Sequence, residues 1–286
     1  MELTEPRVIK DIAQKFGFGF SKGLGQNFLL DKNVLEDIVE AAEPQKGVLE
    51  VGPGFGVLTR ELARASEKVV SIELDKRLFP VLEYTLSEFD NVKLIEGDVL
   101  KLNLNEIIKQ EFGGEKISVA ANLPYYITTP IITMLLEGHF PIKKIVVMVQ
   151  KEVAKRLCAE AGTKDYGAIS VLCGYYTEPR IVTVVPAGKF YPAPKVDSAV
   201  VCLDVCEKPN VLPKDEKMFF RVVKAAFAQR RKTLLNCLSS AFGMDKAQCG
   251  KIIEECGIEP GIRGEKLGIG EFAKLADRFF EETAEG

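Results

Sequence analysis

The feature that most constrains the fold is a regular alternation of short apolar runs with helical stretches between residues 31 and 149. Each apolar run has the length of a buried strand, and each stretch between them has apolar residues at helical spacing. Strands that alternate with helices form a mostly parallel sheet covered on both faces. Right-handed crossovers then give a doubly wound, Rossmann-like α/β domain. The expected strands are 48–51, 69–72, 92–95, 117–121 and 145–149, and the expected helices are 31–44, 57–65, 77–87 and 130–136.

Two later apolar runs, 180–185 and 196–203, follow each other without a helix between them. They predict an antiparallel hairpin at the sheet edge and complete a seven-stranded sheet. Residues 208–213 contain Pro209, Asn210 and Pro213 and resemble a linker, after which the pattern is helical to the end. The sequence therefore predicts a flexible N-terminal arm (1–30), a Rossmann-like domain (31–206) and a small all-helical domain (207–286).

The composition is that of a soluble globular protein, with 47% apolar and 28% charged residues among 286. The formal net charge of −3 means that a nucleic acid would have to meet a local basic patch. Seven cysteines without C-x-x-C spacing and a charged N-terminus predict reduced thiols in a cytoplasmic protein. A single histidine, His139, predicts no metal site. Asn122, Pro124 and Pro130 interrupt the uncharged run 117–136, which favours a strand, a loop and a helix start over a membrane span.

Four residues able to bind a ligand stand at the ends of successive expected strands. Gly52 opens the turn E-V-G-P-G-F-G, and Glu73, Asp98 and Asn122 follow the next three strands. Ligands of open parallel sheets bind beyond the carboxyl ends of the strands, so we expect these residues to line one site. Glu73 follows Gly52 by 21 residues, which suits a carboxylate that binds a ribose diol, and Asp98 could accept from an adenine amino group. A simple tight turn and a solvated glutamate are the alternatives.

The ligand that this pattern favours is S-adenosylmethionine. The glycines are spaced G-x-G-x-G rather than in the dinucleotide pattern G-x-G-x-x-G, and a methyl donor has an adenosine but no pyrophosphate. Residues 26–29 precede the first helix of the domain and could close over the methionine tail. The expected donor site comprises Gln26, Asn27, Leu29, Gly52, Gly54, Glu73, Leu74, Asp98, Val99 and Asn122.

The reaction centre is expected at Asn122, Leu123, Pro124 and Tyr125, which resemble the [DNS]-P-P-[YFW] signature of amino-group methyltransferases. An adenine amine is a poor nucleophile because its lone pair is delocalised into the ring. The Asn122 side-chain oxygen and the Leu123 carbonyl can hold its two N–H groups, Pro124 stiffens the backbone, and Tyr125 can stack on the unstacked base. An ordinary turn after a strand is the alternative. No cysteine follows a proline, which disfavours methylation of a cytosine carbon.

Two further segments are expected to contact RNA. The loop F-Y-P-A-P at 190–194 is rigid, and Phe190 could form the second face of a base sandwich, with loop packing as the alternative. Residues 214–232 contain seven cations and two anions, and on a helix they give one apolar and one cationic face. A cationic face suits a phosphate backbone, although a solvated surface helix has the same pattern. Arg230 falls on the apolar side and is expected in a buried ion pair or between domains. The cationic face comprises Lys217, Arg221, Lys224, Arg231 and Lys232.

Taken together, the motifs resemble the ribosomal small-subunit RNA adenine dimethyltransferases, in particular the bacterial kasugamycin-sensitivity type. The resemblance runs from about residue 20 to residue 280. It rests on G-Q-N-F-L (25–29), E-V-G-P-G-F-G-V-L-T (50–59), I-E-L-D (72–75), G-D (97–98), N-L-P-Y-Y-I-T-T-P (122–130), Q-K-E-V-A-x-R-L (150–157), F-x-P-x-P-K-V-D-S-A-V (190–200) and F-x-Q-R-R-K-T-L (227–234).

This resemblance implies N6,N6-dimethylation of two adjacent adenines in the 3′-terminal hairpin of 16S rRNA during small-subunit biogenesis. It implies S-adenosylmethionine as the donor and an adenine held between Tyr125 and Phe190. The implied partner is 16S rRNA in the immature 30S subunit, and we expect a monomer without a metal. The donor contacts that it implies are Asn27, Leu29, Gly52, Glu73, Asp98 and Asn122.

Two other functions stay open at this point. One is a ribosome-assembly factor whose binding to the immature subunit matters more than its methylation. The other is the related 23S rRNA adenine methyltransferase that confers macrolide resistance. The motifs F-x-P-x-P-K-V-D-S-A-V and F-x-Q-R-R-K favour the small-subunit type over the 23S type.

Overall fold

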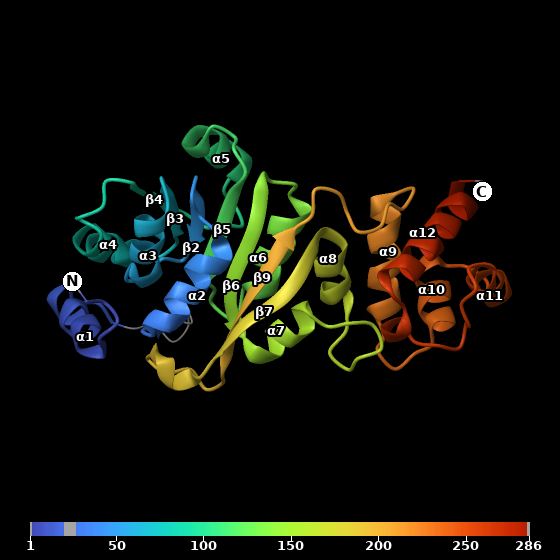
Figure 1. The fold of residues 1–286 in the computed structure, drawn as a ribbon. Coiled ribbons are helices and arrows are strands. Elements are labelled where there is room, and N and C mark those ends of the chain that lie inside the picture. Colours follow the sequence, from blue (N-terminus) through green and yellow to red (C-terminus); the bar gives the residue numbers. More distant parts are fainter. Residues whose placement is uncertain (1, 20–26, 285–286) are drawn as a thin grey trace. The chain divides into compact units, whose positions relative to one another are not determined.

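The computed structural model describes residues 2–19 and 27–284, and the chain divides into two compact units (Figure 1). The first unit comprises Met1–Ala154 and Glu178–Val205, and the second comprises Lys155–Thr177 and Cys206–Gly286. The sequence analysis placed a single boundary near residue 206. The structure differs because the segment Lys155–Thr177 also belongs to the second unit, so the chain crosses between the units three times.

The first unit is built on a seven-stranded sheet. In chain order its strands are β2 (Val48–Val51), β3 (Val69–Glu73), β4 (Val92–Glu96), β5 (Ile117–Asn122), β6 (Ile142–Gln150), β7 (Thr177–Val185) and β9 (Ser198–Val205). Their order across the sheet is β4-β3-β2-β5-β6-β9-β7 (Figure 1). The first five pair in parallel, and β9 pairs with β6 in the antiparallel direction. The expected Rossmann-like sheet is confirmed, and the two late strands are neighbours at one edge.

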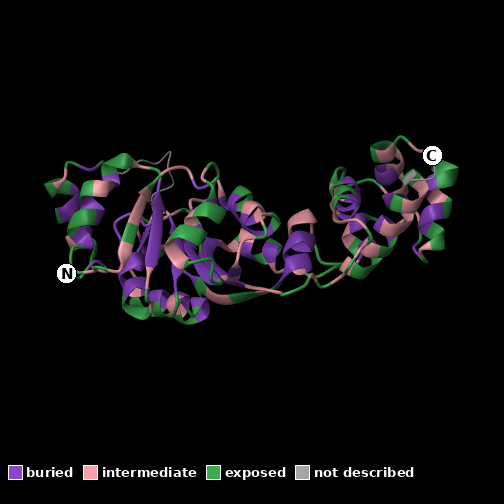
Figure 2. Cartoon of the chain, turned by 90° about the horizontal axis from the view of Figure 1, so that it is seen from above, coloured by how far each residue is buried: buried purple, intermediate pink, exposed green. Residues whose placement is uncertain are grey.

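Helices connect the parallel strands. They are α2 (Lys32–Ala42), α3 (Val57–Ala65), η2 (Lys76–Leu78), α4 (Phe79–Thr85), α5 (Leu104–Phe112) and α6 (Thr128–Glu137), with α7 (Lys151–Leu157) after β6. α2 begins as expected at Asp31, whose side chain accepts a hydrogen bond from the Val34 N–H at 3.2 Å. The strands β2 and β3 are buried along their whole length. Figure 2 colours buried residues purple, and they are concentrated in the sheet and on the inner faces of the helices. The sequence analysis did not anticipate α5, which buries only Leu104 and Ile108 and therefore has a short apolar pattern.

The N-terminal segment differs from the flexible arm that its glycines predicted. Residues Pro6–Lys15 form helix α1, and Ile9, Ile12 and Ala13 on it are buried in the core of the first unit. These three positions have helical spacing, so their apolar face favours docking over a free arm. Further on, β1 (Phe28–Leu29) pairs in the antiparallel direction with β8 (Phe190–Tyr191), which follows the short helix η3 (Ala187–Lys189).

The second unit is helical, as expected. Its elements are α8 (Ala168–Tyr176), α9 (Glu216–Phe227), α10 (Leu234–Phe242), α11 (Lys246–Glu255), η4 (Gly264–Lys266) and α12 (Ile269–Ala284). The ring of Tyr175 on α8 lies 4.8 Å from Phe219 and 5.0 Å from Phe220 on α9. Both Tyr175 and Tyr176 donate hydrogen bonds to Glu216, at 3.2 and 2.9 Å. These contacts explain why the segment that contains α8 belongs with the C-terminal helices.

Candidate active site

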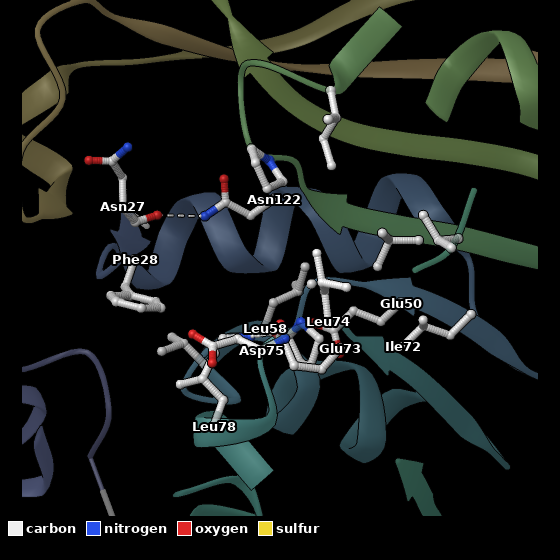
Figure 3. Close-up of a pocket in the computed structure, with 18 of the residues that line it drawn as sticks. Asn27, Phe28, Glu50, Leu58, Ile72, Glu73, Leu74, Asp75, Leu78 and Asn122 are labelled. Carbon is white, nitrogen blue, oxygen red and sulfur yellow. Dashed lines mark hydrogen bonds between the residues drawn. The ribbon is translucent and has the colours of Figure 1, made fainter. Parts of the chain in front are cut away.

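The residues expected to bind the donor lie together at the carboxyl ends of the parallel strands (Figure 3). They line one hollow, whose space amounts to about 1030 Å³ when its open mouth is included. Gln26 lies outside the described residues. The other nine all line the hollow: Asn27, Leu29, Gly52, Gly54, Glu73, Leu74, Asp98, Val99 and Asn122.

The turn between β2 and α3 brings backbone to the wall of the hollow. Gly52 has φ +71° and Gly54 has φ +60°, a conformation that side chains rarely allow. A Cβ added at Gly52 would meet no protein atom within 4 Å, so it would project into open space beside the hollow. A Cβ added at Gly54 would stand 2.6 Å from the ring of Phe28. The turn therefore needs glycine at these two positions for separate reasons, ligand space and packing.

Glu73 ends β3 as a buried carboxyl group, with 7% of its surface exposed. Its oxygens accept hydrogen bonds from the Gly54 N–H at 3.3 Å and from the Asp75 N–H at 2.8 Å. Burial raises the pKa of Glu73, and these backbone donors act in the opposite direction. Each carboxylate oxygen has two lone pairs, so both can still accept a hydroxyl group of a ribose.

Glu50 on β2 is a second buried carboxyl group of the hollow, and the sequence analysis did not assign it to the site. It is 1% exposed and accepts a hydrogen bond from the Ser71 hydroxyl at 2.7 Å. Burial raises the pKa of Glu50 to about 7, and Glu73 on the neighbouring strand acts in the same direction. The sequence signal that could have identified Glu50 is its charge, because it is the charged residue within the otherwise apolar run Val48–Val51.

Asp98 and its neighbours form the wall beyond β4. Asp98 accepts a hydrogen bond from the Leu100 N–H at 3.1 Å, and Val99 beside it is buried. Leu74, which follows β3, is 52% exposed although it is apolar and lines the hollow. A hydrogen-bond acceptor and an exposed apolar side chain that line the same hollow suit a flat heteroaromatic ring with an amino group.

Asn122 ends β5, and its side chain is held by the segment that precedes α2. Its Nδ2 donates a hydrogen bond to the Asn27 carbonyl at 2.9 Å (Figure 3). This bond engages the nitrogen of the carboxamide and leaves Oδ1 available as an acceptor. The structure therefore gives Asn122 the orientation that an amine clamp requires.

The loop after Asn122 has a fixed backbone. The Leu123 N–H donates to the Met148 carbonyl of β6 at 3.2 Å, and the Pro124 carbonyl accepts from the Ile127 N–H at 3.2 Å. Within residues 2–19 and 27–284, no group donates a hydrogen bond to the Leu123 carbonyl. This carbonyl is therefore a second acceptor next to Asn122, while Leu123 itself is buried at 2% exposure.

The expected aromatic residues occupy different positions. The Tyr125 hydroxyl lies 2.7 Å from the Ser198 hydroxyl, and burial raises the pKa of Tyr125. Phe190 is 4% exposed and pairs with Leu29 through β8 and β1, so its ring lies in the core of the first unit. Neither ring lines the hollow, whereas Tyr126, which the sequence analysis did not assign, lines it and is 56% exposed. The sequence signal that could have identified Tyr126 is the pair of successive tyrosines, Tyr125 and Tyr126, directly after Pro124.

The basic residues of the second unit are divided between a helix and a turn. α9 ends at Phe227, so Lys217, Arg221 and Lys224 lie on it, while Arg231 and Lys232 lie in the turn before α10. The structure corrects the expectation of one continuous helix, and it also corrects the expectation that Arg230 could lie in a buried ion pair. Arg230 is exposed and donates to the Lys164 carbonyl. All five residues of the expected cationic face are exposed, and none forms an ion pair with the described part of the chain.

Comparison with known proteins decides the family. A family model described as ribosomal RNA adenine dimethylase matches residues 17–280. The chain belongs to the ribosomal RNA adenine dimethylase family. A protein of Bacillus cytotoxicus named ribosomal RNA small subunit methyltransferase A is 51% identical to this dimethylase over 96% of this chain and 97% of that protein. A protein of the same name from Bacillus mycoides is 49% identical over the same shares.

Two solved structures resemble this dimethylase over most of its length. A dimethyladenosine transferase from Plasmodium falciparum is 25% identical with a TM-score of 0.75, over 90% of this chain and 98% of that one. The 23S rRNA methyltransferase ErmE is 27% identical with a TM-score of 0.69, over 88% of this chain and 99% of that one. The expectation of an rRNA adenine dimethyltransferase is confirmed at the level of the family.

Members of the dimethylase family use S-adenosylmethionine, and the hollow fits this donor. Space is open at Gly52, the Glu73 carboxyl group could accept the hydroxyl groups of a ribose, and the exposed side chain of Leu74 could pack on an adenine. The buried Glu50 adds a carboxyl group suited to a positively charged ligand. The described part of the chain has no group of three or more His, Cys, Asp or Glu side chains arranged to hold a metal ion.

Proposed function

We propose that this dimethylase acts at N6 of two adjacent adenines in the 3′-terminal hairpin of 16S rRNA, in the immature 30S subunit. The relatives at 51% and 49% identity are named small subunit methyltransferases, which supports a small-subunit substrate. The observation that carries the chemistry is the hydrogen bond from Asn122 Nδ2 to the Asn27 carbonyl, because it leaves Oδ1 as an acceptor.

S-adenosylmethionine supplies an electrophilic methyl group on a positively charged sulfur. Asn122 Oδ1 and the Leu123 carbonyl each accept one N–H of the adenine amine, which orients its lone pair for attack. The turn closed by Pro124 and Ile127 keeps the two acceptors at a fixed spacing. Catalysis by this chain is therefore mainly positioning, which is worth several orders of magnitude in rate. The proton is released after transfer and needs no strong base in the site.

We place the donor on the residues that line the hollow. Glu73 binds the ribose, Asp98 and Leu74 hold the adenine, and Glu50 faces the positive charge of the donor. Gly52 and Gly54 bring the backbone close, and residues 27–29 cover the ligand. The arrangement is supported by the shared hollow and by the two backbone donors that orient Glu73.

The target adenine is proposed to enter beside Asn122, with Tyr125 and Phe190 on either side of the base. In the structure Phe190 is buried, so its part of the sandwich requires β8 to yield when the base enters. Tyr126 is exposed at the mouth and adds an aromatic surface beside the entry. The exposed cations of α9 and of the turn after it are proposed to contact the RNA backbone. They are Lys217, Arg221, Lys224, Arg231 and Lys232.

We further propose that the enzyme works as a monomer in the cytoplasm. Among the described residues, no helix has the length and apolar character to cross a membrane. A role as an assembly factor is compatible with this activity, because binding to the immature subunit precedes transfer.

The test is transfer of labelled methyl groups to small subunits that lack the modification, followed by nucleoside analysis and mapping of the product. We expect N6,N6-dimethyladenosine at two adjacent positions near the 3′ end of 16S rRNA. Large subunits serve as the parallel substrate, and Asn122→Ala as the matched inactive variant. Labelling of 23S rRNA in place of 16S rRNA would overturn the proposed substrate, and absence of dimethyladenosine would overturn the proposed reaction.

A further inference from the structure

The side chain of Asn122 is held from a segment that lies 95 residues earlier in the chain. We call residues 27–31 the strap. Its first residue provides the carbonyl that accepts from Asn122 Nδ2 at 2.9 Å, and residues 27–29 also line the donor hollow (Figure 3). One short segment therefore touches both the proposed amine clamp and the proposed donor site.

The strap is anchored along its length. Phe28 and Leu29 pair with Tyr191 and Phe190, and the Leu30 N–H donates to the Lys189 carbonyl at 2.9 Å. Its last residue, Asp31, forms an ion pair with Lys189 at 2.5 Å and also caps α2.

On the side of the hollow, the Phe28 ring holds the strap in place. The ring lies 4.7 Å from the Phe55 ring, edge to face, and covers Gly54 so closely that a Cβ there would be 2.6 Å away. Aromatic contacts of this geometry are stabilising beyond their buried area. The Asn27 carbonyl is thus presented from a packed segment.

A carbonyl oxygen can only accept a hydrogen bond, whereas a carboxamide has one accepting and one donating end. The Asn27 carbonyl therefore selects the orientation in which Nδ2 points at the strap and Oδ1 is left to accept. The flipped orientation would set two acceptor oxygens against each other and lose the hydrogen bond.

We propose that the strap is a positioning element for methyl transfer: the Asn27 carbonyl fixes the Asn122 carboxamide, and the Phe28 ring fixes the strap. This inference rests on the proposed function, because it assigns the strap to the same amine clamp. It also means that a strap displaced from the hollow leaves Asn122 without its orienting partner. One position of the strap therefore serves both the donor hollow and the amine clamp.

The test is a double-mutant cycle between Phe28→Ala and Asn122→Ala, measured as single-turnover methyl transfer to unmethylated small subunits at saturating donor. Saturation removes the effect of Phe28 on donor binding. We expect Phe28→Ala to lower the rate about 10-fold when Asn122 is present and less than about 2-fold in the Asn122→Ala background, since groups that act as a unit are not additive. Equal losses in both backgrounds, or no loss in either, would overturn the proposal.

Phe18→Ala is the matched control. Phe18 also packs on Phe55, with ring centroids 5.4 Å apart, but it lies outside the strap. Unfolding temperatures of the two variants show how much stability each ring contributes. A rate loss in Phe18→Ala that equals the loss in Phe28→Ala would assign the effect to general loosening and contradict a role of the strap.

Asn122→Asp tests the same contact without disturbing the core. A carboxylate keeps an acceptor for the amine but cannot donate to the Asn27 carbonyl, so we expect a rate as low as that of Asn122→Ala. Turnover at the level of the unaltered enzyme would show that the Asn27 carbonyl is not needed. Failure of the proposed function is distinguished from these outcomes, because the unaltered enzyme would then not label the small subunit at all.

Discussion

Glu50 is a charged residue in a position where sheets usually place apolar ones. It is 1% exposed and lines the hollow, and its carboxyl group accepts a hydrogen bond from the Ser71 hydroxyl. A carboxyl group buried in this way favours its neutral form, which is why its pKa rises to about 7. Retaining such a residue costs stability at neutral pH, and a positively charged ligand in the hollow would offset that cost.

This cost gives a prediction on stability. Because the pKa of Glu50 is raised in the folded state, its protonated carboxyl group stabilises the folded state relative to the unfolded state. This stabilisation is fully present below about pH 4.5 and is lost as the pH rises through about 7. We expect Glu50→Gln to remove this loss and to raise the free energy of unfolding above pH 7 by up to about 3 kcal/mol. Denaturant titrations of both proteins between pH 5 and pH 8 measure the difference. The same variant should bind the donor more weakly, and an unchanged pH profile would show that Glu50 does not ionise in this range.

Asn122 gives a prediction on the division between binding and catalysis. We expect Asn122→Ala to keep donor affinity within about 10-fold and to lower turnover by about 100-fold or more, because it removes an interaction that matters in the transition state. Calorimetry with the donor and single-turnover transfer to small subunits separate the two quantities. Unchanged turnover would remove Asn122 from the amine clamp.

At the scale of elements, the turn between β2 and α3 shows how backbone geometry makes room for a ligand. Gly52 has φ +71°, and a Cβ there would meet no protein atom within 4 Å. Gly113 at the end of α5 has a similar φ of +66° and equally open space, but it does not line the hollow. The two glycines therefore share a backbone conformation and differ in what lies beside them.

This difference predicts the effect of a single methyl group. We expect Gly52→Ala to weaken donor binding by about 10-fold or more, or ~1.4 kcal/mol, beyond any effect on stability. Gly113→Ala imposes a comparable backbone strain and should lower stability by roughly 1 kcal/mol while donor affinity stays unchanged. Calorimetric donor affinity and thermal unfolding of both variants provide the comparison. Equal donor affinity in the two variants would place the ligand away from Gly52.

α9 shows how an element can carry a local charge opposite to that of the whole chain. Lys217, Arg221 and Lys224 have no ion-pair partner among the described residues, although Arg221 stacks on Phe242 at 4.3 Å. In contrast, Lys214 and Arg278 in the same unit are paired with acids. Although the whole chain has a net charge of −3, these unpaired cations on α9 are available to bind the phosphates of a nucleic acid.

We expect the triple variant Lys217→Gln, Arg221→Gln, Lys224→Gln to reduce the salt dependence of RNA binding. Each phosphate contact contributes about 0.7 to 0.9 to the slope of log affinity against log salt, so the slope should fall by about 2. Affinities measured at four or more salt concentrations give the slope. Lys251→Gln is the control, because Lys251 lies on α11 beside Glu255. A slope that stays the same would leave α9 as an ordinary solvated helix.

At the scale of the whole molecule, the second unit is assembled from two segments of the chain. Tyr175 on α8 is 2% exposed because Phe219 and Phe220 of α9 cover it. Gly174 lies so close to Ile269 of α12 that a Cβ would be 2.7 Å away. The helices after residue 206 therefore complete a core that begins in Lys155–Thr177.

This arrangement predicts the result of truncation. A chain ended after Val205 would leave the apolar face of α8 uncovered, so we expect it to aggregate and to bind a hydrophobic dye. A second chain ended at the same residue, with 155–177 replaced by a Gly/Ser linker, should stay soluble and bind the donor, because both cuts then follow the unit boundaries. Light scattering, dye fluorescence and donor calorimetry compare the two. Equal solubility of both chains would contradict the two-segment unit.

Sequence alone was sufficient where the signal is periodic or local. The apolar runs predicted the parallel strands, because strand burial on both faces requires near-continuous apolar residues. The positions of Gly52, Glu73, Asp98 and Asn122 at strand ends predicted that they share a site, because parallel strands end at one edge. Asp31 predicted the start of α2, because an N-cap depends on a side chain and the next three residues.

Tertiary structure decided whatever depends on partners distant in the chain. The pairing of Asn27 with Asn122 spans 95 residues, and the docking of α1 and the cover over Tyr175 also come from remote segments. The same is true of the buried state of Phe190, for which the sequence analysis left both a base platform and loop packing open. Periodicity identifies which face of a segment is apolar, but only the folded chain determines what covers that face and which atom of a carboxamide is left free.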